Sequence, residues 1–235
     1  MAKYVYLMGS GFLCLISFAM VARRRDLVPW TLLYGSIGGL VQVATSFLYV
    51  RDYWRPPTVF GTAVSIEDFL FGFGVTAFPF LAYPVFAKKK FTPSDHPARL
   101  GVYLGFALVA ALVLFGGTLA LGWNSLVVSL VLLAAFTLCV CAIRPDLVKG
   151  ALFAVGIVTA CLVPVYVLMF DVIAPGWWDR YWLLAGSGMD QRFFGDVPVL
   201  ELLCYITWSG FAATGHPFIV GHAFAARDLE PRAQP

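Results

Sequence analysis

Carboxylic acids stand near the start of two apolar segments, one in each half of the chain. The first segment opens with Ser65–Asp68 and the second with Pro198–Glu201. Carboxylates in or beside membrane-spanning segments are costly to desolvate, so they indicate a functional site. A buried carboxyl group favours its protonated form and can serve as a general acid, while a neighbouring carboxylate takes a proton back. The catalytic candidates are Glu67, Asp68 and Glu201.

A structural role for these acids is the alternative. Acidic side chains in the first turn of a helix interact favourably with the helix dipole, and acids at a membrane interface can simply be hydrated. The matched position in both segments favours the functional interpretation. Aligning Ser65 with Pro198 places Asp68 opposite Glu201 and Glu67 opposite Leu200.

Aromatic residues gather at the same level of the two segments. Their ring faces could stabilise a cation formed from an apolar substrate, although Trp and Tyr are also common anchors at membrane interfaces. The substrate-binding candidates are Phe69, Phe71, Trp182, Tyr205 and Trp208. Three further residues are expected to support the site by ordering the outer loops or lining the cavity mouth: Asp52, Asp171 and Pro198.

The segments that must position these residues are apolar and long. Of the 235 residues, 60% are hydrophobic and 12% are charged, and the mean hydropathy is +0.83. Runs of about 18 or more apolar residues predict membrane-spanning helices. We therefore expect an all-α membrane protein with seven transmembrane helices in one domain, residues 1–235, at about 4–21, 28–50, 64–86, 100–121, 125–143, 148–173 and 197–224.

The positive charges predict the topology. The first apolar run precedes Arg23–Arg25 and has no small-residue cleavage site, so we interpret it as a signal anchor with the N-terminus outside. This orientation puts eleven Lys and Arg residues inside and five outside, which satisfies the positive-inside rule. We expect a multi-pass integral membrane protein in a bacterial cell membrane, with its C-terminus in the cytoplasm. The net charge of +3 then reflects topology, and nucleic acid is not expected as a partner.

An internal repeat is visible in the sequence. Arg24–Val28 opens the second apolar run and Arg144–Val148 opens the sixth, each with Arg-x-Asp-Leu-Val. A Trp-containing outer loop and a glycine then precede each acidic motif. We predict two parallel three-helix repeats, residues 1–90 and 125–225, joined by a connecting helix at 100–121. Alternatively, Asp26 and Asp146 are helix N-caps that recur by chance.

Other site chemistries find no support in the sequence. The five cysteines lie within apolar runs without metal-ribbon spacing, and the three histidines, His96, His216 and His222, are scattered. The Gly-Ser-Gly stretches do not complete a dinucleotide fingerprint, and the last helix has no lysine that could attach retinal. No metal and no cofactor are expected.

The duplicated acidic motif resembles the lycopene cyclase domain, an integral-membrane family of fused or heterodimeric carotenoid cyclases. The resemblance lies in the stretches from Asp52 to Phe71 and from Asp171 to Glu201. It implies redox-neutral cyclisation of lycopene-like end groups, with an apolar isoprenoid as substrate. Two positions depart from the family pattern, Ser65 for its proline and Leu200 for its first acid.

Other classes of protein remain open from the residues alone. The chain could be a homologue that acts on another isoprenoid, or a non-enzymatic seven-helix transporter, sensor or accessory subunit in the lipid bilayer. A proton path should continue across the membrane, whereas no acid follows Glu201 within the last helix. Homo- or hetero-oligomerisation also stays open.

Overall fold

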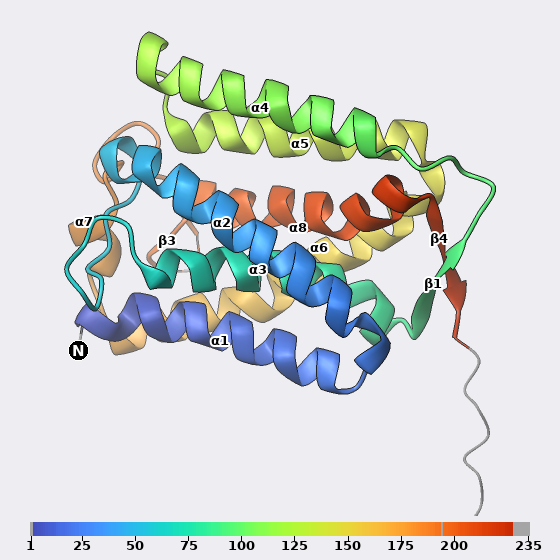
Figure 1. Ribbon diagram of the computed structural model, residues 1–235. Coiled ribbons are helices and arrows are strands. Elements are labelled where there is room, and N and C mark those ends of the chain that lie inside the picture. Colours follow the sequence, from blue (N-terminus) through green and yellow to red (C-terminus); the bar gives the residue numbers. More distant parts are fainter. Residues whose placement is uncertain (1, 194, 228–235) are drawn as a thin grey trace, which may run out of the picture.

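The computed structural model describes residues 2–193 and 195–227, which form a bundle of long helices (Figure 1). The long helices are α1 (Ala2–Ala22), α2 (Val28–Asp52), α3 (Ile66–Phe86), α4 (Leu100–Leu121), α5 (Ser125–Ile143), α6 (Val148–Tyr166) and α8 (Val199–Val220). The short elements are η1 (Arg25–Leu27), β1 (Lys89–Pro93), η2 (Pro145–Leu147), η3 (Val167–Ile173), α7 (Trp177–Tyr181), β2 (Arg192–Phe193), β3 (Val197–Pro198) and β4 (His222–Ala226).

The prediction of an all-α membrane protein is confirmed. Six of the described helical segments are long and apolar enough to cross a membrane. They differ in burial, since 72% of the α3 span is buried inside the bundle but only 11% of the α4 span. Helix α3 is therefore central, whereas α4 lies at the edge and packs mainly against α5 (Figure 1).

Small residues let α2 and α3 approach closely. Gly35 and Gly39 on α2 have the Gly-xxx-Gly spacing that brings membrane helices together. At their contact, a Cβ on Gly72 of α3 would lie 2.5 Å from the backbone oxygen of Gly38. The absence of side chains at these positions therefore fixes how α2 lies on α3.

Helix α8 is the second buried helix, and it packs against α3, α5 and α6. It ends at Val220, because Gly221 adopts a left-handed conformation (φ +74°) and its N–H donates to the carbonyl of Pro217. The expectation of a helix up to residue 224 was thus wrong. After the turn, β4 pairs antiparallel with β1, from Lys89 opposite Ala226 to Pro93 opposite His222.

Two buried arginines make matching contacts at the end of the bundle that carries β1 and β4. Arg24 binds both carboxylate oxygens of Asp26, and Arg144 does the same with Asp146, each at 2.8 and 2.7 Å. The N-cap assignment of the two aspartates was wrong, because α2 and α6 begin after Leu27 and Leu147 and neither has a side-chain cap. The aspartates instead neutralise guanidinium groups that are only 3% and 1% exposed.

Candidate active site

Glu201 lies in the first turn of α8, at the end of the bundle that carries α7 (Figure 1). The predicted supporting residue Pro198 is the N-cap residue of this helix and ends β3. The Glu201 side chain is 4% exposed. It accepts a hydrogen bond from the hydroxyl of Tyr166 at 3.0 Å and a short one from the hydroxyl of Tyr53. Tyr166 is also hydrogen-bonded to Tyr205, so three tyrosines surround this carboxyl group.

Asp68 lies in the first turn of α3 and is also buried. Its Oδ1 accepts from the hydroxyls of Tyr6 (3.0 Å) and Ser46 (2.8 Å), and its Oδ2 accepts from the backbone N–H of Ser65 (2.8 Å). The contact with Ser65 closes a capping box, which is the structural role considered above. The hydrogen bonds from Tyr6 on α1 and Ser46 on α2 are not part of this capping box, so Asp68 also links three helices.

Glu67 makes its described side-chain hydrogen bond outside the cavity. Its Oε1 accepts from the backbone N–H of Val59 at 2.6 Å, in the loop between α2 and α3. Its Oε2 is buried without a hydrogen-bond partner among the described residues. Glu67 therefore orders the loop that leads into α3.

A cavity of about 50 Å³ lies beside Glu201. Its walls come from α1, α3, α6, α8, η3 and the end of α2, and they are largely apolar. Glu201 is the only carboxylic acid among the described residues that line it. Five tyrosines also line it: Tyr6, Tyr49, Tyr53, Tyr166 and Tyr205. The cavity thus combines one acid, several hydroxyl groups and an otherwise apolar surface.

The five aromatic candidates are divided between the cavity and its surroundings. Phe71, Tyr205 and Trp208 line it, and the Trp208 indole donates to Thr76 at 3.1 Å. Trp182 lies behind the lining, edge-on to Tyr53 with ring centroids 5.1 Å apart. Phe69 does not line the cavity and instead occupies the contact with Gly39 on α2.

The two supporting aspartates have different surroundings. Asp52 accepts from the backbone N–H of Ser125 at 2.7 Å, so it holds the start of α5. Asp171 lies in η3, a π-helical segment, and its Oδ1 is buried without a hydrogen-bond partner in the described part of the chain. A Cβ on Gly195 would lie 2.2 Å from the other oxygen of Asp171, and the left-handed backbone of Gly195 (φ +76°) also favours glycine there.

The hydroxyl groups that bind the acids were not predicted from sequence; they belong to Tyr6, Ser46, Tyr53 and Tyr166. The repeat held a usable signal for two of them. Ser46 and Tyr166 are separated by the same number of residues as Arg24 and Arg144. Extending the predicted repeat along α2 and α6 therefore pairs Ser46 with Tyr166, just as the acidic motifs pair Asp68 with Glu201.

The polypeptide around α7, residues 174–198, covers this end of the bundle and is called the cap below. Trp177, Trp178 and Trp182 are 1%, 0% and 2% exposed. The Trp178 ring is nearly parallel to that of Tyr166, with centroids 5.9 Å apart. Trp182 and Trp178 therefore pack against Tyr53 and Tyr166, the two tyrosines that donate to Glu201.

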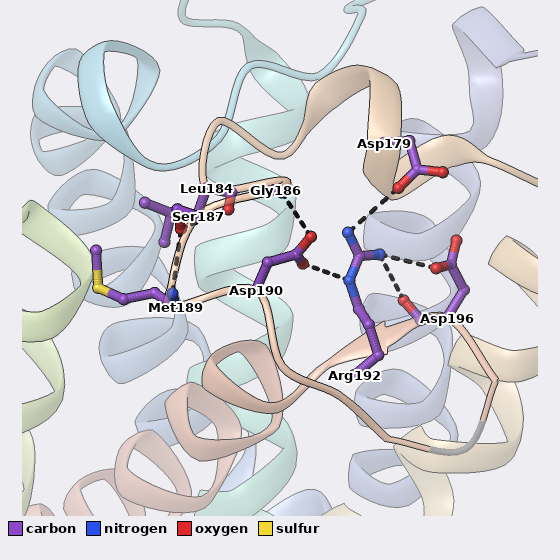
Figure 2. A network of polar contacts seen from close by, with 8 residues as sticks. All are labelled: Asp179, Leu184, Gly186, Ser187, Met189, Asp190, Arg192 and Asp196. Atoms are coloured by element: carbon purple, nitrogen blue, oxygen red, sulfur yellow. Dashed lines mark hydrogen bonds and ion pairs between the residues drawn. The ribbon is translucent and has the colours of Figure 1, made fainter.

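Arg192 holds the cap together, as Figure 2 shows. Its guanidinium binds Asp190, Asp196 at 2.9 Å and Asp179 at 3.3 Å. Asp190 also accepts from the backbone N–H of Gly186 at 2.8 Å. The hydrogen bond from Arg192 holds the pKa of Asp190 below its usual range, although partial burial opposes this. Burial raises the pKa of Asp196, and Arg192 offsets this only in part.

The cap should therefore weaken in acid. The folded pKa of Asp190 lies below the unfolded value of about 3.9, so its contribution is complete above that range and is lost as the pH falls through the folded pKa. We expect Asp190→Asn to cost roughly 1 kcal/mol at neutral pH. The difference in thermal midpoint between the variant and the wild type should shrink as the pH is lowered to about 3. A difference that stays constant over this range would contradict the assignment.

Comparisons with protein-family models, with curated proteins and with solved structures found no match for this sequence.

Proposed function

We propose that this protein is a membrane enzyme that cyclises the end group of a linear, lycopene-like isoprenoid by acid–base chemistry. One observation carries the proposal: Glu201 is the only described carboxylic acid in a largely apolar cavity among membrane-spanning helices. A carboxyl group in such surroundings loses little by remaining neutral and much by becoming charged. It is therefore suited to hold a proton and deliver it to an apolar substrate.

In the proposed reaction, Glu201 donates its proton to the terminal carbon–carbon double bond. The resulting carbocation is attacked by a nearby double bond of the same molecule, which closes a six-membered ring. Loss of a proton from the ring restores a double bond, so substrate and product are isomers. The tyrosines hydrogen-bonded to Glu201 orient the carboxyl group. After turnover a tyrosine passes its hydroxyl proton to Glu201 while it takes up a proton from solvent, and the proton released from the ring leaves to solvent, which restores the starting state.

Tyr6 and Asp68 are the proposed acceptor of the released proton. The Tyr6 side chain lines the cavity, and its hydroxyl donates to Asp68. A proton taken up by the Tyr6 oxygen can therefore pass to the carboxylate as the hydroxyl proton moves on. The rings of Phe71 and Trp208 line the same cavity and would stabilise the intermediate cation. The proposed catalytic residues are thus Glu201 and Tyr6, with Asp68 acting through Tyr6.

The proposal includes seven spans, with α8 as the last. Its 22 residues measure about 33 Å, enough for a hydrocarbon core of about 30 Å. The two parallel repeats are supported by the paired Arg24–Asp26 and Arg144–Asp146 contacts. They are further supported by the agreement between Ser46–Asp68 and Tyr166–Glu201. The charge bias favours an outer N-terminus and a cytoplasmic C-terminus in a bacterial membrane. One of the residues counted on the inner side, Arg232, lies outside the described residues.

Expression in cells that accumulate lycopene tests this function. Pigment extraction followed by chromatography should show cyclised products that are absent from cells with the empty vector. Unchanged lycopene, with the protein present in the membrane fraction, would contradict cyclisation of this substrate. Extracts from cells that accumulate other linear isoprenoids would then show whether a related substrate is used.

A further inference from the structure

The cavity beside Glu201 is partly open, and its most accessible wall is on α1. Phe12 is 39% exposed, while Gly9, one turn earlier on α1, is half-buried. Val165 on α6 lines the cavity and is also half-buried. Helices α1 and α6 each pack on α3. The cavity is therefore bordered by apolar residues of α1 and α6, and the boundary between these two helices is called the seam below.

The segment around α7 and the packing of α2 on α3 close two other approaches. On the α7 side, Trp178 and Trp182 are almost completely buried and pack over Tyr166 and Tyr53. A ligand from water would have to displace these rings and the Arg192 network. The close contact between α2 and α3 at Gly38 and Gly72 leaves no passage there.

Gly9 leaves free space at the seam. A Cβ built on Gly9 meets no atom within 4 Å, although the residue lines the cavity. Gly11, on the same helix, is equally unobstructed but does not line the cavity. A glycine in a helix interior costs about 1 kcal/mol relative to alanine. A larger side chain at position 9 would fill this free space beside the cavity.

We propose that the substrate enters sideways from the lipid between α1 and α6, past Gly9. The chemistry of the occupant, an elongated isoprenoid whose last unit reaches Glu201, rests on the function proposed above. The rest of the molecule remains in the hydrocarbon region of the bilayer, against the lipid-facing surfaces of both helices. Phe12 and Val165 must move as the last unit enters, because the cavity of about 50 Å³ is much smaller than the cavity of about 150 Å³ that holds a benzene ring.

Photolabelling tests this entry route independently of catalysis. The probe is a C40 linear polyene with a diazirine on its terminal unit, added to the protein in lipid nanodiscs. The background is Glu201→Gln, so that labelling does not depend on turnover. Mass spectrometry should find label on residues 5–13 of α1 and on residues 162–169, at the end of α6 and the start of η3. Gly9→Phe should lower this labelling at least tenfold, while Gly11→Phe should leave it within twofold.

The same two substitutions, made with Glu201 intact, link entry to activity. Gly9→Phe should abolish product formation, and Gly11→Phe should preserve it, with both variants retaining the thermal midpoint of the parent. Labelling at the seam without any cyclised product would uphold the entry route and overturn the proposed function. Labelling that persists in Gly9→Phe, or that maps to the α7 cap or to α4 and α5, would overturn the entry route itself.

Discussion

Replacing Glu201 by glutamine is expected to lower the rate of cyclisation by roughly 10²- to 10⁴-fold, the usual contribution of a general acid. The amide fits the same space: its oxygen can accept a hydrogen bond from one of Tyr53 and Tyr166, and its NH2 group can donate to the hydroxyl oxygen of the other. It cannot, however, deliver a proton to a double bond. The rate is measured from cyclised product formed per unit of purified protein in nanodiscs, and the thermal midpoint reports whether the variant remains folded.

Glu67→Gln is the matched control for this prediction. Glu67 is also a buried glutamate in the first turn of a helix, but it contacts Val59 and does not line the cavity. Its neutralisation should leave the rate within about threefold of the wild type. Equal losses in the two variants, or full activity in Glu201→Gln, would contradict the assignment of Glu201 as the proton donor.

A valine at Gly72 is expected to prevent α2 from packing on α3. Its Cβ would lie 2.4 Å from the Cβ of Gln42 and 2.5 Å from the backbone oxygen of Gly38. A backbone atom cannot rotate out of the way, so the helices must separate. Because Ser46 on α2 also binds Asp68 on α3, the separation should disturb the site as well. We expect a loss of about 3 kcal/mol or more of stability.

Thermal unfolding in detergent, together with the amount of protein in the membrane fraction, measures this effect. Gly105→Val is the control, since Gly105 lies on exposed α4 and a Cβ there meets no atom within 4 Å. It should match the wild type within about 0.5 kcal/mol. A stable Gly72→Val protein with a normal midpoint would show that α2 and α3 are not held as closely as described.

The positions of the long helices could be predicted from sequence because a membrane imposes a simple rule. Each span must satisfy its backbone internally and present about 20 apolar residues, and this leaves a strong signal. The acids at the start of α3 and α8 gave a similarly strong signal, since carboxylates are rare there. The end of α8 was less predictable, because its final residues are apolar and only the turn at Gly221 stops the helix.

The surroundings of the acids could not be predicted because they depend on how the helices face one another. In a membrane helix, side chains toward lipid and toward the core are both apolar, so periodicity reveals little about facing. Phe69 and Phe71 are two residues apart, yet Phe71 lines the cavity and Phe69 packs against α2. Tyrosine hydroxyls reach Glu201 from α6 and from the residue after α2, and a third tyrosine, on α8, is hydrogen-bonded to Tyr166.

Mass analysis of the product formed in heavy water tests the central claim most directly. Purified protein in nanodiscs, without added cofactor, is incubated with lycopene in H₂O and in D₂O. Acid–base cyclisation predicts a product with the mass of lycopene in H₂O and one additional deuterium per ring in D₂O, because the donated proton exchanges with solvent. A product whose mass differs from lycopene in H₂O, or a cyclised product without deuterium in D₂O, would contradict proton transfer from Glu201.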